Sequence, residues 1–280
     1  MKLFKVAADF LRWRKGQSET LGFVPTLGAL HEGHFSLIKK SKDLCRFTVV
    51  SIFLNPTQFS PDEDLRNYPQ TLNLDIIHLK RLGVDVLFLP TEEEMYKKAG
   101  DVNIEPTNLF NKLEGSSRPH FFYGVTTIVA KLFNIIQPSH TFFGEKDAQQ
   151  LRIIKQMIVN MKYPIILISC SIVRNKDGLA LSSRNQRLTK KQRQVATEIY
   201  KGLIYIQQGL NEGQKILKLK EFFHLFIEKV PDMTVDYLSF ACSDTLEEIN
   251  QVTNKSILVS TAVFFHNIRL IDNFTYLPST

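Results

Sequence analysis

The stretch LGFVPTLGALHEGH, residues 21–34, combines a short apolar segment, a glycine-containing loop and two histidines. Residues 21–26 are apolar and partly β-branched, a composition typical of a buried strand. Gly28 and Gly33 follow this segment, and a helical pattern begins after Gly33. A strand, a glycine loop and a helix N-terminus in this order predict an anion site, because the first N–H groups of a helix have no partner within the helix.

Strand and helix patterns continue to alternate after this stretch, up to about residue 175. Repeated strand–helix–strand units predict a parallel sheet with helices on both faces, a Rossmann-like α/β domain whose ligands bind beyond the carboxyl ends of the strands. Further strands are predicted at residues 47–54, 84–89, 141–143 and 164–173, and helices at residues 36–44, 72–82, 125–136 and 149–161.

The pattern changes near residues 174–178, where the polar segment RNKDGLALSSRNQR begins. Two amphipathic helices and three strands follow, and helices followed by clustered strands predict a small α+β domain. We therefore divide the chain into residues 1–175 and 176–280. The helices of the second part are predicted at residues 190–208 and 216–230, and its strands at residues 235–240, 256–265 and 269–272.

Composition narrows the class of protein. The 280 residues include 35 Lys and Arg against 28 Asp and Glu, a net charge of +7 that favours anionic ligands but contains no basic block typical of nucleic-acid binding. Three distant cysteines without a CxxC motif argue against disulfides and zinc ribbons. No signal-peptide pattern and no membrane-length apolar run occurs, so we expect a soluble cytoplasmic protein that binds neither nucleic acid nor membrane.

His31 and His34 are three residues apart, so on a helical turn they share one face. Two imidazoles beside a bound phosphate can neutralise the charge that develops on a leaving phosphate. A surface pair or a zinc site is the alternative interpretation. Zinc needs a third and a fourth ligand, and no other His or Cys lies nearby in the sequence.

Three more loops follow predicted strands. In FGEKD, Gly144 permits a tight turn and Lys146 is a point charge suited to phosphate, although a capped helix with solvated charges explains the segment equally well. The segment 176–185 offers two hydroxyls, a Lys and an Arg, which suit phosphate or a mobile lid; an interdomain linker is the alternative. Gln58 can hold a hydroxyl or a carboxylate, although as a lone signal it fits a plain loop residue better. Together these loops predict a phosphate-handling enzyme without naming its substrate.

Five motifs in this order resemble the pantoate–beta-alanine ligase family: PTLGALHEGH, SIFLNPTQF, LEGSSRP, FGEKDAQQL and KDGLALSSRN, with RLIDN near the end of the chain. The resemblance implies a nucleotidyltransferase-type Rossmann domain with an HxGH motif, a small C-terminal lid domain and a homodimer. It implies ATP, Mg²⁺, pantoate and beta-alanine. Pantoate would form a pantoyl adenylate and release pyrophosphate, and beta-alanine would then release AMP to give pantothenate.

The same resemblance implies roles for single residues. His31, His34, Lys146 and Arg184 would be catalytic, with His34 as the proton donor. Gln58 and Gln150 would bind pantoate, and Gln58 would also meet beta-alanine. Asn55 and Tyr68 would support the pocket wall, and Asp75 would lie near Mg²⁺. The ATP-binding residues would be Leu27, Gly28, Ala29, Leu30, His31, Glu32, Gly33, His34, Gly144, Glu145, Lys146, Asp147 at the ribose, Val173 at the adenine, and Leu181, Ser182, Ser183 and Arg184 in a loop that closes over the triphosphate.

Some positions depart from the family pattern. Leu27 stands where Met is common, a change that conserves volume. Thr57 replaces a common Met and Ala148 a common aromatic residue, and both changes would loosen the pantoate pocket. His120 lies one place earlier than the usual histidine and receives no role. The competing functions are another HxGH adenylyl- or cytidylyltransferase and a non-catalytic RNA-binding protein; the 21 phenylalanines fall mainly in apolar runs, which disfavours base stacking.

Overall fold

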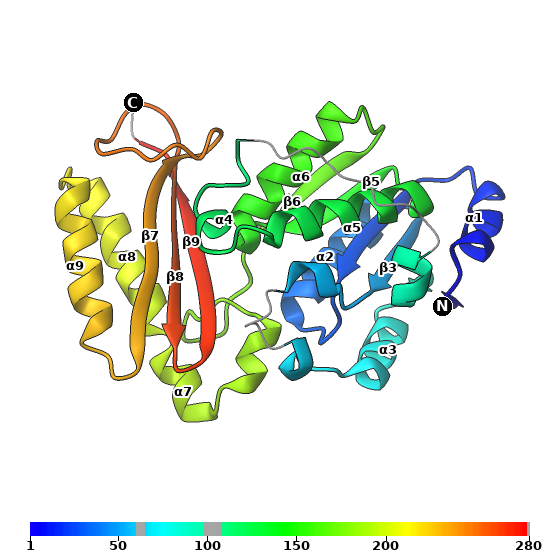
Figure 1. The fold of residues 1–280 in the computed structure, drawn as a ribbon, viewed down its shortest axis with the longest axis horizontal. Coiled ribbons are helices and arrows are strands. Elements are labelled where there is room, and N and C mark those ends of the chain that lie inside the picture. The colour runs from blue at the N-terminus through cyan, green and yellow to red at the C-terminus, as the bar shows by residue number, and fades with distance from the viewer. Residues whose placement is uncertain (60–64, 98–107, 279–280) are drawn as a thin grey trace. The chain divides into compact units, whose positions relative to one another are not determined.

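The computed structural model describes residues 1–59, 65–97 and 108–278, which form two compact units (Figure 1). Unit 1 comprises residues 1–110 and 118–173, and unit 2 comprises residues 111–117 and 174–280. The short segment 111–117 packs with unit 2 although it lies far from it in the sequence. The division near residue 175 that we drew from the sequence places this segment in the first part. The composition of residues 111–117 does not indicate that they pack with the second part.

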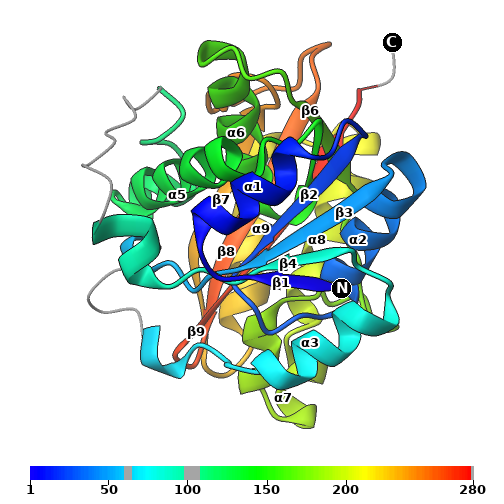
Figure 2. The same cartoon turned by 90° about the vertical axis from the view of Figure 1, so that its right-hand side faces the viewer.

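Unit 1 is built on one sheet of six strands in the order β1-β4-β3-β2-β5-β6. Every pair of neighbouring strands is parallel, with Val24 opposite Val50 and Phe143 opposite Ser169. Strands β1, β4, β3 and β2 lie side by side in Figure 2. The predicted Rossmann-like parallel sheet is confirmed. Its strands are β1 (Lys2–Phe4), β2 (Leu21–Thr26), β3 (Phe47–Ile52), β4 (Val86–Phe88), β5 (His140–Gly144) and β6 (Ile166–Cys170).

Helices cover both faces of this sheet, because successive strand residues point to opposite sides. Phe23, Val49 and Phe88 join one core cluster with helices α1, α5 and α6, and Val24 and Val50 join the other with α2 and α3. Burial of both faces explains why the strands are almost uniformly apolar in sequence. The helices are α1 (Ala7–Lys15), α2 (Glu32–Leu44), α3 (Leu72–Arg81), α5 (Phe121–Ile136) and α6 (Ala148–Asn160).

Unit 2 contains an antiparallel sheet of three strands in the order β7-β8-β9. Helices α8 and α9 pack on this sheet around Leu203, Phe223, Phe240 and Val259, which are all buried. The predicted small α+β domain is confirmed. Its elements are α4 (Glu114–Ser117), α7 (Lys190–Val195), α8 (Glu198–Asn211), α9 (Ile216–Glu228), β7 (Met233–Cys242), β8 (Ile257–Phe265) and β9 (Ile268–Tyr276).

Two details of the predicted elements differ from the structure. The single helix predicted at residues 190–208 is wrong, because α7 ends at Val195 and α8 begins at Glu198. At this break the hydroxyl of Thr197 donates to the carbonyl of Gln194 at 2.6 Å, a side-chain bond that competes with the helical pattern. Strand β1 and helix α1 were not predicted; β1 has only three residues and takes its register from β4.

Candidate active site

The two glycine-containing loops of unit 1 begin at the point in the sheet where the order of the strands reverses. From β2 the chain adds β3 and β4 on one side, and it then adds β5 and β6 on the other side. Strands β2 and β5 are neighbours, with Gly22 opposite His140. In open α/β sheets ligands bind at this switch point, outside the carboxyl ends of the strands. Residues 27–34 and 144–147 leave the sheet there.

A buried carboxylate from α3 holds the first loop. Asp75 is 1% exposed, and its Oδ2 accepts the N–H of Ala29 at 3.0 Å while its Oδ1 accepts the N–H of Leu30 at 2.9 Å. The loop needs this support because Gly28 (φ 88°) and Ala29 (φ 51°) are left-handed, a conformation unfavourable for alanine. These two N–H groups therefore face a carboxylate of the protein, and the α2 terminus offers a ligand other donors.

Those donors are the rings of His31 and His34. His31 is the N-cap of α2, and its Nδ1 accepts the N–H of Gly33 at 3.1 Å. The N–H of His31 in turn donates to Nδ1 of His34 at 3.3 Å, and the ring centroids are 4.1 Å apart. A Cβ on Gly33 would lie 2.8 Å from the His31 ring, so only glycine allows the ring to fold back. The HxGH spacing thus builds one compact pair.

The hydrogen bonds fix the proton positions on both rings. Each Nδ1 accepts a backbone N–H, so each neutral imidazole carries its proton on Nε2. Burial, reinforced by the charge of Lys146, lowers the pKa of His31 to about 4, although Asp147 raises it slightly. Burial, followed by the proximity of His31 and Lys146, puts the pKa of His34 well below its usual value. At neutral pH the pair is two uncharged Nε2–H donors.

The second loop brings Lys146 and Asp147 to the same place. It consists of a 3₁₀ turn, η4 (Glu145–Asp147), between β5 and α6. Lys146 lies close enough to both histidine rings, and Asp147 to His31, for their charges to act on the pKa of those rings. Lys146 Nζ lies 3.8 Å from a carboxylate oxygen of Asp147. The structure therefore groups His31, His34 and Lys146, which are three of the four predicted catalytic residues.

Gly144 does not make the tight turn that the sequence predicted. Its φ of −80° and ψ of 139° are available to any residue. A Cβ at this position would meet no described atom within 4 Å. The glycine leaves open space at the carboxyl end of β5, where a side chain would otherwise project.

The predicted acid-binding residues lie in two further segments of unit 1. Gln58 is buried at the end of the 3₁₀ turn η1 (Pro56–Gln58), after β3, and its Oε1 accepts the amide of Asn55 at 3.0 Å. Gln150 is half-buried in the first turn of α6, next to η4. Tyr68, the other predicted wall residue, stacks edge-on against Phe59. Val173, predicted to meet the adenine, is half-buried three residues after β6.

The remaining predicted loop, residues 176–185, belongs to unit 2. Asp272 of β9 accepts two hydrogen bonds from Arg174, at 2.6 and 2.8 Å, and Arg174 also donates to the carbonyl of Gly178 at 3.0 Å. A Cβ on Gly178 would clash with the Tyr200 ring. Ser182 caps the 3₁₀ turn η5 (Ser183–Arg187) by accepting the N–H of Arg184. The role of residues 181–184 in ATP binding remains a prediction.

A resident metal ion does not fit the described residues. They contain no group of three His, Cys, Asp or Glu side chains arranged to hold one. Asp75, which the resemblance placed near Mg²⁺, has both oxygens engaged by N–H donors, and the hydroxyl of Thr71 also donates to Oδ1 at 3.1 Å. This carboxylate shapes the loop and is not a free cation ligand.

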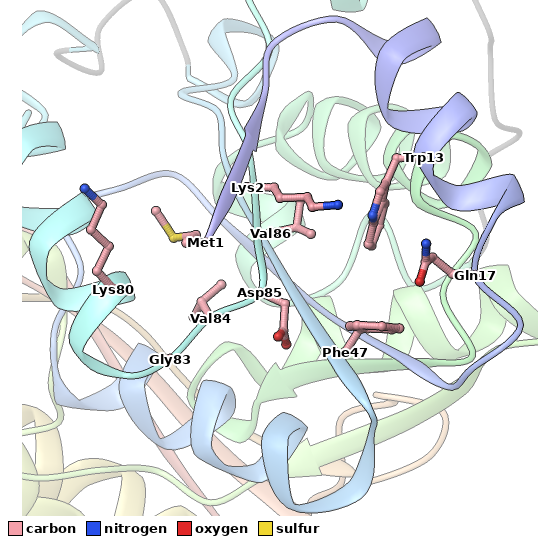
Figure 3. Close-up of a pocket in the computed structure, with 10 residues that line it drawn as sticks. All are labelled: Met1, Lys2, Trp13, Gln17, Phe47, Lys80, Gly83, Val84, Asp85 and Val86. Atoms are coloured by element: carbon pink, nitrogen blue, oxygen red, sulfur yellow. The ribbon is translucent and has the colours of Figure 1, made fainter.

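A separate pocket of about 480 Å³ lies at the opposite end of the strands (Figure 3). Its lining includes Lys2, Phe47 and Val86, which stand at the amino ends of β1, β3 and β4. Trp13 of α1 closes one side, with the ammonium of Lys2 5.9 Å from its ring centroid. The pocket contains none of the predicted site residues and is not part of the site at the switch point.

A histidine pair with ring N–H donors, a neighbouring lysine and a parallel sheet switch point define an α/β enzyme that acts on phosphate-containing substrates. Comparison with known proteins identifies the family within this class. The profile of the family described as Pantoate-beta-alanine ligase matches residues 2–275. The chain belongs to this family.

Individual relatives match over almost their whole length. The chain is 41% identical to the pantothenate synthetase of Fervidobacterium nodosum over 277 residues, which cover 98% of each chain. It is 42% identical to that of Clostridium botulinum over 266 residues, 95% of this chain and 94% of the other. The crystal structure of pantothenate synthetase from Thermus thermophilus superposes with a TM-score of 0.91 at 35% identity, covering 99% of this chain and 100% of that chain. The family membership predicted from five motifs is confirmed.

A second solved relative carries ligands. The pantoate–beta-alanine ligase of Francisella tularensis, described as complexed with beta-gamma ATP and beta-alanine, superposes with a TM-score of 0.81 at 35% identity. The superposition covers 98% of this chain and 97% of the chain of the relative.

Within the residues that the structure describes, none of the helices has the length and apolar character needed to span a membrane.

Proposed function

We propose that this chain joins pantoate to beta-alanine with ATP in two steps, through a pantoyl adenylate. The observation that carries the proposal is the pair of uncharged histidine donors beside Lys146 at the switch point, in a chain of the pantoate–beta-alanine ligase family. The ATP and beta-alanine named for the Francisella tularensis relative support the same substrates here.

In the first step a carboxylate oxygen of pantoate forms a bond to the α-phosphorus of ATP. The bond from that phosphorus to the bridging oxygen breaks, and its electron pair leaves with pyrophosphate. His31 and His34 donate from Nε2 to phosphate oxygens that gain charge, and Lys146 adds a fixed positive charge. Donors set in place before the reaction stabilise such charge most effectively in a site shielded from water.

In the second step the amine nitrogen of beta-alanine forms the amide bond with the acyl carbon. The bond between that carbon and the AMP oxygen breaks, the electron pair leaves with AMP, and the amine loses a proton. Gln58 and Gln150 hold pantoate for both steps, and Gln58 also contacts beta-alanine. Amides suit this task because pantoate has a carboxylate and hydroxyls.

The remaining assignments complete the proposal on the strength of the sequence resemblance. Residues 27–34 and 144–147 and the backbone of Val173 bind ATP, and residues 181–184 contribute Arg184 to its phosphates. Mg²⁺ acts as the counter-ion that ATP brings on its phosphates, a binding mode that Mg²⁺ favours. The enzyme works as a cytoplasmic homodimer.

Product analysis tests this function. Incubation with ATP, pantoate and beta-alanine should yield AMP, pyrophosphate and pantothenate in equal amounts. ATP and pantoate without the amine should release pyrophosphate only up to the amount of enzyme. ADP with inorganic phosphate as the products would contradict the adenylate route, and pyrophosphate release that needs no pantoate would point to a different nucleotidyltransferase.

A further inference from the structure

The predicted acid ligand Gln58 is the last member of a chain of hydrogen bonds. Asn55, which is 0% exposed, donates from Nδ2 to Oε1 of Gln58 at 3.0 Å and to the carbonyl of Gly124 at 3.1 Å. The hydroxyl of Tyr96 donates to Oδ1 of Asn55 at 2.5 Å, and that of Thr57 donates to the same oxygen at 3.0 Å. All four bonds that the Asn55 amide can make are therefore formed within unit 1.

This chain fixes which way the Gln58 amide points. The carbonyl of Gly124 can only accept, so the Asn55 atom that faces it is the nitrogen. The same nitrogen faces Gln58, so the Gln58 atom next to it is the oxygen. The NH₂ group of Gln58 consequently points away from Asn55. The assignment depends on a backbone carbonyl and not on a free choice of amide rotamer.

Two packing contacts hold this chain of hydrogen bonds in place, one at Tyr96 and one at Gly124. Tyr96 lies in η3 (Glu93–Lys97), and the buried Lys131 of α5 donates to the neighbouring carbonyl of Met95 at 2.9 Å with its ammonium 5.2 Å from the Tyr96 ring. Burial raises the pKa of Tyr96, so its hydroxyl keeps the proton that it donates. A Cβ on Gly124 would clash with the carbonyl of Thr57, so α5 packs directly against η1.

We propose that Tyr96 and Thr57 are positioning residues that act through Asn55 to hold Gln58 with its NH₂ group toward a carboxylate oxygen of the bound substrate. The inference rests on the proposed function and deepens it, since pantoate and beta-alanine are both carboxylates. The inference also changes the role that we expect for Thr57. Its hydroxyl supplies a second donor to Asn55 that methionine lacks, so this position stabilises the pocket and does not loosen it.

A double-mutant cycle tests the positioning role, because it isolates an effect that passes through a second residue. Tyr96→Phe and Thr57→Val each remove one hydroxyl, and we expect each to raise the KM of the carboxylate substrate about 2–10-fold, the loss typical of one neutral hydrogen bond. The KM of ATP should not change. Thr57→Ser keeps the hydroxyl and should behave like the wild type. In a Gln58→Met background, Tyr96→Phe should add almost nothing.

The orientation of Gln58 has its own test. Gln58→Glu keeps the shape and the acceptor toward Asn55 but replaces the NH₂ group with an oxygen, and Gln58→Met removes both polar atoms. We expect Gln58→Glu to raise the KM at least as much as Gln58→Met, because two carboxylates would then face each other. Separate titrations of pantoate and beta-alanine identify which carboxylate Gln58 meets.

The outcomes are distinct. If the wild type shows no pyrophosphate release that depends on pantoate, the proposed function fails and this inference fails with it. If the wild type is active but Gln58→Glu binds both acids normally, the orientation is wrong. An equal effect of Tyr96→Phe with Gln58 and with Met at position 58, or an equal rise in the ATP KM, would reduce Tyr96 to a structural residue and overturn its positioning role.

Discussion

Oδ1 of Asp75 lies 2.9 Å from the backbone nitrogen of Leu30, so a carboxylate of α3 fixes the loop that leads into the histidine pair. Oδ2 of the same residue accepts the N–H of Ala29, whose φ of 51° is unfavourable without such support. The position of His31, the next residue after this loop, therefore depends on a side chain 44 residues further along the chain.

Asp75→Asn should impair both the fold and the reaction. The amide can accept only with its oxygen, so it turns an N–H donor toward one of the two loop N–H groups. We expect a loss of about 1–3 kcal/mol in the free energy of unfolding, the penalty of a buried group left unsatisfied. Urea unfolding measures the loss, and pyrophosphate release measures the accompanying fall in rate. Asp43→Asn, at an exposed position on α2, is the control. Unchanged stability in Asp75→Asn would show that the loop does not depend on the carboxylate.

His34→Ala should slow adenylate formation by about 10²–10³-fold, the usual effect of losing one transition-state donor. His34→Asn is the matched variant, because Asn retains an acceptor for the N–H of His31 but lacks the Nε2–H donor. Both variants should lose the same rate, and the Asn variant should unfold like the wild type. The measurement is pyrophosphate release in a single turnover. A wild-type rate in either variant would remove His34 from the reaction.

The low pKa values of the two histidines predict how stability varies with pH. Below about pH 6.5 the unfolded chain binds protons on these residues, whereas folded His31 binds one only near pH 4. Unfolding is therefore favoured as the pH falls through this window, by up to about 1.4 kcal/mol per pH unit for each histidine. Urea unfolding measures the free energy of unfolding at pH 7 and at pH 5. The difference between these two values should be smaller for a His31→Asn, His34→Asn double variant than for the wild type. An identical pH dependence of the two proteins would mean that both rings protonate normally.

The strands and the two loops at the switch point were predictable from sequence, because burial of both sheet faces leaves apolar runs and the loops keep their glycines and charges together. Strand β2 has the predicted bounds, and β5 extends the predicted segment by one residue at each end. Asp75 and Tyr96 could not be placed in this way. Each acts on a partner more than 40 residues distant, Asp75 on Leu30 and Tyr96 on Asn55, through a side-chain contact that leaves no local pattern.

Unit 2 contains a buried ionic group in which Arg269 bonds Glu114 at 2.5 and 2.6 Å and Asp236 at 2.5 Å. Glu114 is 7% exposed and lies in the short segment 111–117, which belongs to unit 2. Glu114→Gln removes one of the two carboxylates that bond the buried Arg269, while Asp236 keeps its own bonds to the same guanidinium. We therefore expect Glu114→Gln to lower the free energy of unfolding by about 1–3 kcal/mol.

The control for this prediction is the exposed pair of Lys201 and Glu198, 2.7 Å apart on α8. Glu198→Gln should change stability by less than about 1 kcal/mol. Chemical unfolding of the two variants in parallel compares the two pairs directly. Equal losses from both variants would indicate that burial does not distinguish these ion pairs.

Gln150→Ala separates pantoate binding from ATP binding. Gln150 lies in the first turn of α6, three residues after Asp147, so the nucleotide loop and the amide share one end of one helix. An amide that donates to a carboxylate and accepts from a hydroxyl suits pantoate, and each partner left unpaired in a buried site costs about 1–3 kcal/mol. The apparent constant for pantoate should therefore rise about 5–150-fold, while that for ATP changes little. Gln156→Ala, at an exposed position on the same helix, is the matched control and should leave both constants unchanged. Titration of each substrate decides the matter, because equal losses for ATP and pantoate, or no loss for either, would refute the assignment of Gln150 to the acid.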